Sequence, residues 1–215
     1  PKILVTEPEY FTPESLRRMR KVGFLTAKRM PRPELLRTVK NFDVLVVRVE
    51  TNVDRDLISR AARLTCVVSA TTGLNHIDTA ALKSRHISVF FLHGTHSIST
   101  AEHALALLFA AARQIPQANA RMREGHWRRF EHIGTELHGK TLGILGIGRI
   151  GKEMAIRAGA LGMNVIAYDP YVSTQEIKKR GARKVNWQNF IKTSDCISLH
   201  APLTAETKHM FGKKE

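Results

Sequence analysis

The sequence runs LGILGIGRIG from Leu142 to Gly151, where an apolar stretch leads into three glycines with the spacing G-x-G-x-x-G. The spacing alone is a weak signal, because short glycine patterns often arise by chance. Here the pattern follows a strand-like run and begins a helix-like one, and the acidic residue Asp169 ends the next strand-like run. Together these features predict a Rossmann dinucleotide-binding unit, which holds a nucleotide at a glycine-rich turn between strand and helix.

Each position of the motif has a physical role in such a unit. Gly146 allows a tight turn, Gly148 lets the backbone approach a pyrophosphate without an intervening Cβ, and Gly151 lets the helix pack close to the strand. The backbone N–H groups of Arg149 and Ile150 then point towards phosphate oxygens at the positive end of the helix. These five residues are the first candidate coenzyme ligands.

Asp169 indicates which dinucleotide the unit prefers. Its carboxylate can accept hydrogen bonds from both hydroxyls of the adenosine ribose. The same negative charge repels a 2′-phosphate, which NADP carries and NAD lacks. The sequence therefore predicts NAD as the cofactor.

The rest of the chain alternates between strand-like and helix-like segments. Continuous β-branched runs such as 43–48 are typical of parallel strands that are covered on both faces. The predicted strands are 2–6, 43–48, 64–68, 87–91, 141–145, 164–168, 183–185 and 196–200. The predicted helices are 13–21, 54–63, 78–85, 101–112, 149–161, 174–180 and 187–193. Such alternation predicts an α/β protein with doubly wound parallel sheets.

The middle of the chain differs from both flanks. Ser99 and Glu102 fit a capping box at the start of a helix that is rich in alanine and leucine and apolar almost all round. We expect this helix to be buried between layers and to end or kink at Pro116. The following segment, 124–139, is irregular and predicts a crossing between two domains.

Composition places the chain among soluble globular proteins, with 43% hydrophobic and 25% charged residues in 215. No run approaches the roughly 18 apolar residues of a membrane-spanning helix, and the first residues lack a secretory signal pattern. Cys66 and Cys196 lie inside apolar runs and predict no disulfide framework, which favours a cytoplasmic location.

The formal net charge of +15 is unusual for such a composition. A basic surface can attract nucleic acid, anionic membranes or anionic substrates. The lysines and arginines are scattered in short groups, however, without a long basic tract or an aromatic RNA-binding signature. A solvated basic surface is therefore the favoured interpretation, and neither a nucleic-acid nor a membrane partner is expected.

The glycine motif belongs to a wider set of motifs along the chain. They are HGKTLGILGIGRIG at 138–151, ALGMNVIAYDP at 160–170, STAEH at 99–103, GHW at 125–127 and LHAPLT at 199–204. With this combination, the chain resembles the D-isomer-specific 2-hydroxyacid dehydrogenases over essentially its whole length. That family includes phosphoglycerate, glycerate or hydroxypyruvate, and D-lactate dehydrogenases.

The resemblance implies a division into a substrate domain and a coenzyme domain, with the active site between them. The flavodoxin-like substrate domain would take up residues 1–98. Linking helices and the crossing would take up residues 99–139, and the Rossmann coenzyme domain would take up residues 140–215. Both domains would be incomplete at the C-terminal side. The resemblance also implies a homodimer.

Further candidate site residues follow from the resemblance. The loop Ala70, Thr71, Thr72 and Gly73 matches a family loop whose backbone N–H groups hold the substrate carboxylate, and a short loop of small residues suits an anion. Thr72 also matches a position near the nicotinamide. Arg48 matches a position beside the substrate in some phosphoglycerate enzymes, although an ordinary strand-end charge explains it equally well. The turn at the adenine side of NAD is matched by His200, Ala201 and Pro202.

The family's catalytic arginine, glutamate and histidine all follow the Pro-Leu-Thr turn, and we expect them to lie beyond Glu215. None of the ten histidines has the catalytic context, so no catalytic residue is assigned. His96 stands where many relatives have asparagine. A metal site at His93 and His96 is not favoured, because no third ligand has suitable spacing.

Two hypotheses remain open at this point. The first is an NAD-dependent enzyme that interconverts a D-2-hydroxyacid and its 2-oxoacid by hydride transfer. The second is a regulatory protein that keeps the NAD site without turnover, as the corepressor relatives of this family do.

Overall fold

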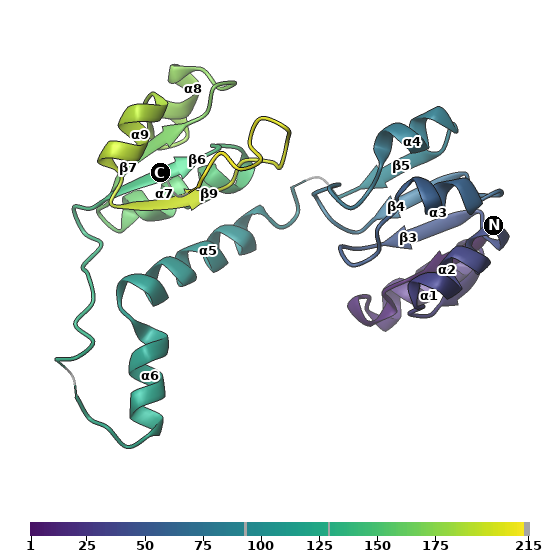
Figure 1. Ribbon diagram of the computed structural model, residues 1–215, viewed down its shortest axis with the longest axis horizontal. Coiled ribbons are helices and arrows are strands. Elements are labelled where there is room, and N and C mark those ends of the chain that lie inside the picture. The colour runs from purple at the N-terminus through teal and green to yellow at the C-terminus, as the bar shows by residue number, and fades with distance from the viewer. Residues whose placement is uncertain (93, 129, 213–215) are drawn as a thin grey trace. The chain divides into compact units, whose positions relative to one another are not determined.

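The computed structural model describes residues 1–92, 94–128 and 130–212. The chain forms two compact units, Pro1–Thr95 and His96–Glu215 (Figure 1). Within the described residues, no helix is long and apolar enough to cross a membrane.

The first unit is a parallel five-stranded sheet with the strand order β2-β1-β3-β4-β5. Its strands are β1 Lys2–Val5, β2 Phe24–Ala27, β3 Val44–Val47, β4 Cys66–Ser69 and β5 Ser88–Phe91. The helices are α1 Pro13–Val22, α2 Arg32–Thr38, α3 Arg55–Arg60 and α4 Thr79–Ser84, with 3₁₀ turns at Pro8–Tyr10 and Val39–Asn41. This order is that of a flavodoxin-like sheet, which confirms the predicted fold of the unit.

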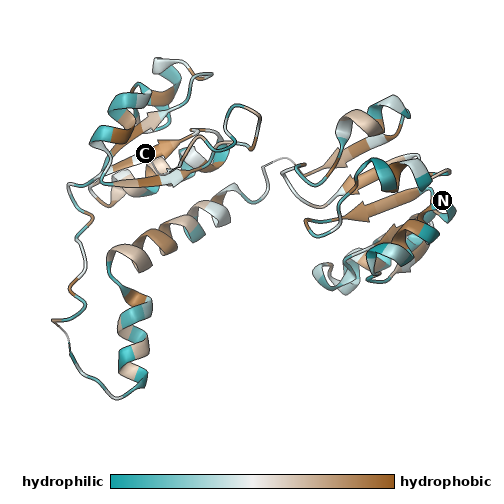
Figure 2. Cartoon of the chain, in the orientation of Figure 1, coloured by the Kyte–Doolittle hydropathy of each residue, from teal (hydrophilic) through white to brown (hydrophobic). Residues whose placement is uncertain are grey.

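Alternate residues of the central strands are buried on opposite faces of this sheet, because side chains of a strand point to the two sides in turn. Leu4, Leu45 and Val67 belong to the cluster on one face. Ile3 and Val46 belong to the cluster on the other face. Figure 2 shows most strands of both sheets as hydrophobic, as expected for parallel sheets that are covered on both sides.

Two elements of the first unit were not predicted from the sequence. Strand β2 lies at the edge of the sheet, where Phe24 is 82% exposed, so it lacks the continuous apolar run of a central strand. Helix α2 has a single fully buried side chain, that of Leu35, and begins beside prolines that interrupt a helical pattern. Proline is nevertheless tolerated in the first turn of a helix.

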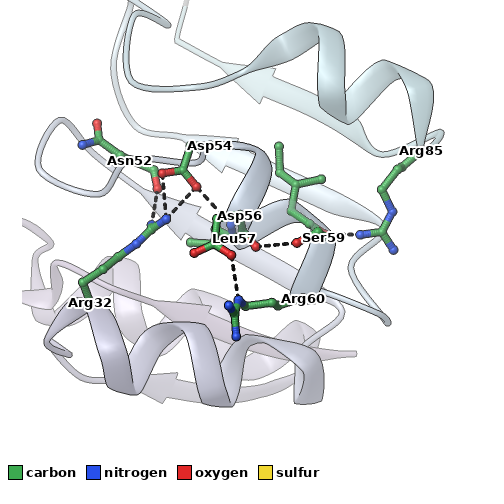
Figure 3. A network of polar contacts seen from close by, with 9 residues as sticks. Arg32, Asn52, Asp54, Asp56, Leu57, Ser59, Arg60 and Arg85 are labelled. Atoms are coloured by element: carbon green, nitrogen blue, oxygen red, sulfur yellow. Dashed lines mark hydrogen bonds and ion pairs between the residues drawn. The ribbon is translucent and has the colours of Figure 1, made fainter.

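Polar contacts connect helices α2 and α3 (Figure 3). Both terminal nitrogens of the Arg32 guanidinium are used: Nη1 donates to the Asn52 carbonyl (2.8 Å) and Nη2 to the Asp54 carboxylate (2.6 and 2.7 Å). Asp54 is also the N-cap of α3, where its Oδ1 accepts from the Leu57 N–H (3.0 Å). One carboxylate therefore caps α3 and holds it to α2.

Replacing Asp54 by alanine should lower the free energy of unfolding by about 1 kcal/mol, the usual effect of losing an N-cap. Partial burial alone would raise the pKa of Asp54, but hydrogen bonds from Leu57 and Arg32 lower it below the usual carboxyl value. The stabilisation is therefore present at neutral pH and is lost as the pH falls through this lowered pKa. Urea unfolding of the wild type and of Asp54→Ala at several pH values measures the difference in the free energy of unfolding.

The control for this prediction is Asp56→Ala in the same helical turn. Asp56 pairs with Arg60 (2.8 Å), but both side chains are about half exposed, so its loss should change stability by less than about 0.5 kcal/mol. An equal loss in the two variants would contradict the role of Asp54 as the cap.

The second unit contains a parallel four-stranded sheet with the order β8-β7-β6-β9. Its strands are β6 Thr141–Leu145, β7 Asn164–Tyr168, β8 Arg183–Lys184 and β9 Cys196–Leu199. The helices are α5 Ser97–Ala112, α6 Ile115–Arg123, α7 Arg149–Ala160, α8 Thr174–Lys179 and α9 Trp187–Thr193. The strand–turn–helix–strand order from β6 to β7 confirms the predicted Rossmann topology.

The sheet of the second unit is also covered on both faces. One cluster includes Leu142, Ile144 and Met154 and is joined by residues of α5. The other is centred on the fully buried Phe190 of α9. Helix α5 itself is less buried than its composition suggested, since Leu107 is 58% exposed.

The structure corrects two details of the predicted middle region. Helix α5 begins at Ser97, so Ser99 lies inside its first turn and donates from Oγ to the His96 carbonyl (3.2 Å) instead of forming a capping box. Pro116 does not end α5. It lies in the first turn of α6, which follows a break at Gln114 (φ 52°), because proline fits the start of a helix better than its interior.

Candidate nucleotide-binding site

Gly146 is the first glycine of the turn between β6 and α7. Its φ of +81° lies in the left-handed region that favours glycine. A Cβ at this position would also lie 2.7 Å from backbone atoms of Ala201. The turn therefore requires glycine for its conformation and for the close approach of the segment after β9.

The other two glycines of the motif meet opposite requirements. A Cβ on Gly151 would lie 2.4 Å from the Gly146 carbonyl oxygen, because α7 packs directly against the turn. A Cβ on Gly148 would have no atom within 4 Å. The protein itself therefore leaves open space at Gly148, at the N-cap of the 12-residue helix α7. A phosphate needs such open space to accept hydrogen bonds from the first N–H groups of a helix, which have no partner within the helix.

Asp169 follows β7 and is held by two backbone groups. Its Oδ2 accepts from the Ile147 N–H (3.1 Å) and its Oδ1 from the Tyr171 N–H (3.0 Å). A carboxylate has about four acceptor positions, so each oxygen can accept a further hydrogen bond. The side chain is thus fixed in orientation and still able to bind hydroxyl groups.

A cavity of about 530 Å³ lies beside this carboxylate. One wall comes from the ends of β6 and β7, and the other from the segment that follows β9. Its lining residues are Leu145, Gly146, Tyr168, Asp169, Pro170, Tyr171, Ala201, Pro202, Thr204, Ala205, Glu206, Thr207 and Met210. The cavity is large enough for a nucleoside, and it brings the predicted residues Gly146, Asp169, Ala201 and Pro202 together.

His200 lies next to this cavity without lining it. Its backbone N–H donates to the Leu145 carbonyl (2.8 Å), and its Nε2 lies 2.8 Å from the Ser198 hydroxyl. Burial lowers the pKa of His200, so the ring is neutral at physiological pH. His200 therefore fixes the turn that places Ala201 and Pro202, an indirect role that the motif alone did not indicate.

A second, smaller hollow of about 260 Å³ adjoins Gly148. It is lined by four cationic residues and one acidic residue: Arg149, Lys152, Lys179, Arg180 and Glu176. Arg180 donates from Nη1 to the Ile147 carbonyl (2.6 Å) and pairs with Glu176 (2.9 Å). The hollow gives the open side of the glycine turn a positive character, and its residues on α8 could not be found from the motif.

In the first unit, Ala70–Gly73 follow β4 at the carboxyl edge of the sheet. The Ala70 N–H already donates to the Val47 carbonyl (2.9 Å), so it is not available to a ligand. The buried Thr71 hydroxyl donates to the Gly73 carbonyl (2.9 Å) and lies 2.7 Å from Ser69 Oγ, which fixes the shape of the loop. Thr72 and Gly73 are exposed.

Arg48 follows β3 at the same edge and is partly engaged. Its guanidinium lies 5.2 Å from the centre of the Tyr10 ring, and Nη1 donates to the Tyr10 carbonyl (3.4 Å). The Tyr10 hydroxyl in turn donates to Glu50 (2.5 Å). Arg48 is therefore oriented by neighbours while keeping donors for an anion.

A buried polar cluster supports this edge and was missed in the sequence. Glu7 is 2% exposed and accepts from the Thr51 N–H (2.8 Å) through Oε1, while its Oε2 has no partner among the described residues. His76 lies 3.3 Å from Ser69 Oγ. Burial lowers the pKa of His76, and the charge of Glu7 partly opposes this shift. No sequence pattern marks these residues, because they come from separate segments.

No group of three or more potential metal ligands occurs in the part of the chain that the structure describes. His93 lies outside the described residues, so the expectation that His93 and His96 form no metal site stays untested.

Comparison with known proteins places these features in a family. The family model described as D-isomer specific 2-hydroxyacid dehydrogenase, NAD binding domain, matches residues 105–215. The D-3-phosphoglycerate dehydrogenase of Archaeoglobus fulgidus is 43% identical over 214 residues, which are 99% of this chain and 40% of that protein. The chain thus spans less than half the length of this curated relative.

Two solved structures resemble the chain as well. The NAD-dependent formate dehydrogenase from Staphylococcus aureus in complex with NAD matches with a TM-score of 0.88 at 27% identity, covering 100% of this chain and 69% of that one. An acyclic imino acid reductase in complex with NADPH and D-Arg matches with a TM-score of 0.83 at 29% identity. The match covers 96% of this chain and 67% of the reductase chain. These two similar chains are therefore described with different nicotinamide dinucleotides.

Proposed function

The chain belongs to the family of D-isomer specific 2-hydroxyacid dehydrogenases, and we propose that it binds NAD and interconverts a D-2-hydroxyacid and its 2-oxoacid by hydride transfer. The observation that carries this proposal is the open space at Gly148 next to the cavity beside Asp169. The first would take a pyrophosphate and the second an adenosine.

The residues of this site would hold NAD from one end to the other. The N–H groups of Arg149 and Ile150, at the start of α7, would bind the pyrophosphate. Asp169 would accept from the ribose hydroxyls, and Ala201 and Pro202 would cover the adenine. When bound, NAD supplies the acceptor or donor of the hydride.

The first unit would supply the substrate side. We keep the division into a substrate domain (1–98), linking helices and a crossing (99–139) and a coenzyme domain (140–215) as part of the proposal. The exposed Thr72 and Gly73, with Thr71, would offer backbone N–H groups to the substrate carboxylate, and Arg48 would attract its charge. Thr72 would also lie near the nicotinamide. No residue of this chain is assigned to the proton transfer.

The experiment combines binding with turnover. Quenching of protein fluorescence by NADH tests the coenzyme site, and loss of NADH absorbance with glyoxylate, hydroxypyruvate or 3-phosphohydroxypyruvate tests the reaction, in the protein at the length that its gene encodes. We expect binding and turnover of at least one 2-oxoacid. Binding without turnover on the whole panel would instead support the corepressor-like alternative, and no binding would refute both.

We also propose that the protein is a homodimer. Large apolar side chains are exposed on and after α5 and α6, among them Leu107, Ile115, Met122 and Trp127. Exposed apolar surface of this kind is typical of an interface between subunits. Light scattering gives the molar mass that decides this point. The cytoplasmic location and the lack of a nucleic-acid partner stay predictions from composition.

A further inference from the structure

Charged groups are distributed unevenly along the candidate coenzyme site. Cations gather at the hollow beside Gly148, where the pyrophosphate would lie. The cavity at the ribose end has the opposite character, because Asp169 and Glu206 both line it. In the described part of the chain, neither carboxylate forms an ion pair with a lysine or arginine. Their negative charges are therefore not neutralised locally.

Tyr171 connects these two carboxylates across the cavity. Its backbone N–H donates to Asp169 Oδ1 (3.0 Å), and its hydroxyl donates to Glu206 Oε2. The distance between the two carboxylates is therefore at most the length of one tyrosine, from its backbone N–H to its hydroxyl, plus a hydrogen bond at each end. The hydrogen bond to Glu206 also raises the pKa of the Tyr171 hydroxyl, so the tyrosine stays a neutral donor. Glu206 is held in place although it comes from the segment after β9.

We propose that Glu206 is a second determinant of coenzyme choice, which acts with Asp169 against a coenzyme that carries a 2′-phosphate. The inference rests on the proposed NAD site. A ribose held at Asp169 directs its 2′ substituent into a cavity whose opposite wall carries Glu206. A phosphate there would bring nearly two negative charges towards two unpaired carboxylates, whereas a 2′-hydroxyl meets hydrogen-bond acceptors.

The test compares two fragments of the coenzyme, AMP and adenosine 2′,5′-bisphosphate, by their displacement of NADH from the protein. The wild type should prefer AMP. Glu206→Gln keeps an oxygen that can accept from Tyr171 and removes only the charge. In this variant the preference for AMP should fall about fivefold at low salt, as expected for like charges several ångströms apart in water, and less at high salt. Asp169→Asn with Glu206→Gln should lower the preference further than either substitution alone.

The matched control is Glu124→Gln, an exposed carboxylate that pairs with Arg121 (3.2 Å) and does not line the cavity. It should leave the preference unchanged. An unchanged preference in Glu206→Gln, or an equal change in affinity for both fragments, would overturn this inference alone while NADH still binds. If the wild type binds neither NADH nor AMP, the proposed NAD site fails and this inference with it.

Discussion

Replacing Gly148 by alanine should lower the affinity for NAD about 100-fold and lower the free energy of unfolding by less than about 1 kcal/mol, because Gly148 is the N-cap of α7 and alanine is a poorer N-cap than glycine. The backbone at Gly148 is extended (φ −67°, ψ −151°), and a Cβ would meet no protein atom within 4 Å. The added methyl group would instead occupy the space where the pyrophosphate approaches the start of α7. Losing about 3 kcal/mol of charge-assisted hydrogen bonding corresponds to roughly a 100-fold loss of affinity.

Gly159→Ala provides the matched control, because Gly159 also has open space around it and lies in the same helix. Alanine is the better helix former, so this variant should gain up to about 1 kcal/mol of stability and bind NAD normally. Titration with NADH and urea unfolding give the two quantities. Normal binding by Gly148→Ala would show that no phosphate lies at this turn.

The glycine motif could be predicted from the sequence because its requirements are mostly local. A tight turn, a helix start and an acidic residue after the next strand all occur within one short segment. The close packing that requires Gly151 lies inside this segment as well. Central strands such as β3 and β6 were predictable for a similar reason, since burial on both faces favours apolar residues along the strand.

Features that depend on distant segments were not predictable in the same way. The contact between Gly146 and Ala201 joins two strand ends that only the folded sheet brings together. The approach of Lys179 and Arg180, at the end of α8, to Gly148 depends on the folded structure in the same way, and so does the connection between Tyr171 and Glu206. Strand β2 was missed because an exposed edge strand carries no strong apolar pattern.

Replacing Phe190 by alanine should lower the free energy of unfolding by about 3–5 kcal/mol, the usual cost of emptying a buried aromatic site. The ring is fully buried and stacks on Trp187 with centroids 5.7 Å apart. It also packs against the backbone of β6, since a Cβ on Gly143 would lie 2.9 Å from its Cε2 atom. Urea unfolding followed by tryptophan fluorescence and circular dichroism measures the loss.

Phe24→Ala makes the same substitution at an exposed position and should cost less than about 0.5 kcal/mol. A similar loss in both variants would refute the assignment of Phe190 to the core.

Stabilisation by the ligand then distinguishes a variant that has lost stability from one that has lost the NAD site. Saturating NAD should raise the urea midpoint of Phe190→Ala as it does that of the wild type, because a ligand stabilises any fold that retains its site. The same concentration should barely shift Gly148→Ala, whose fold is intact and whose phosphate-binding turn is blocked.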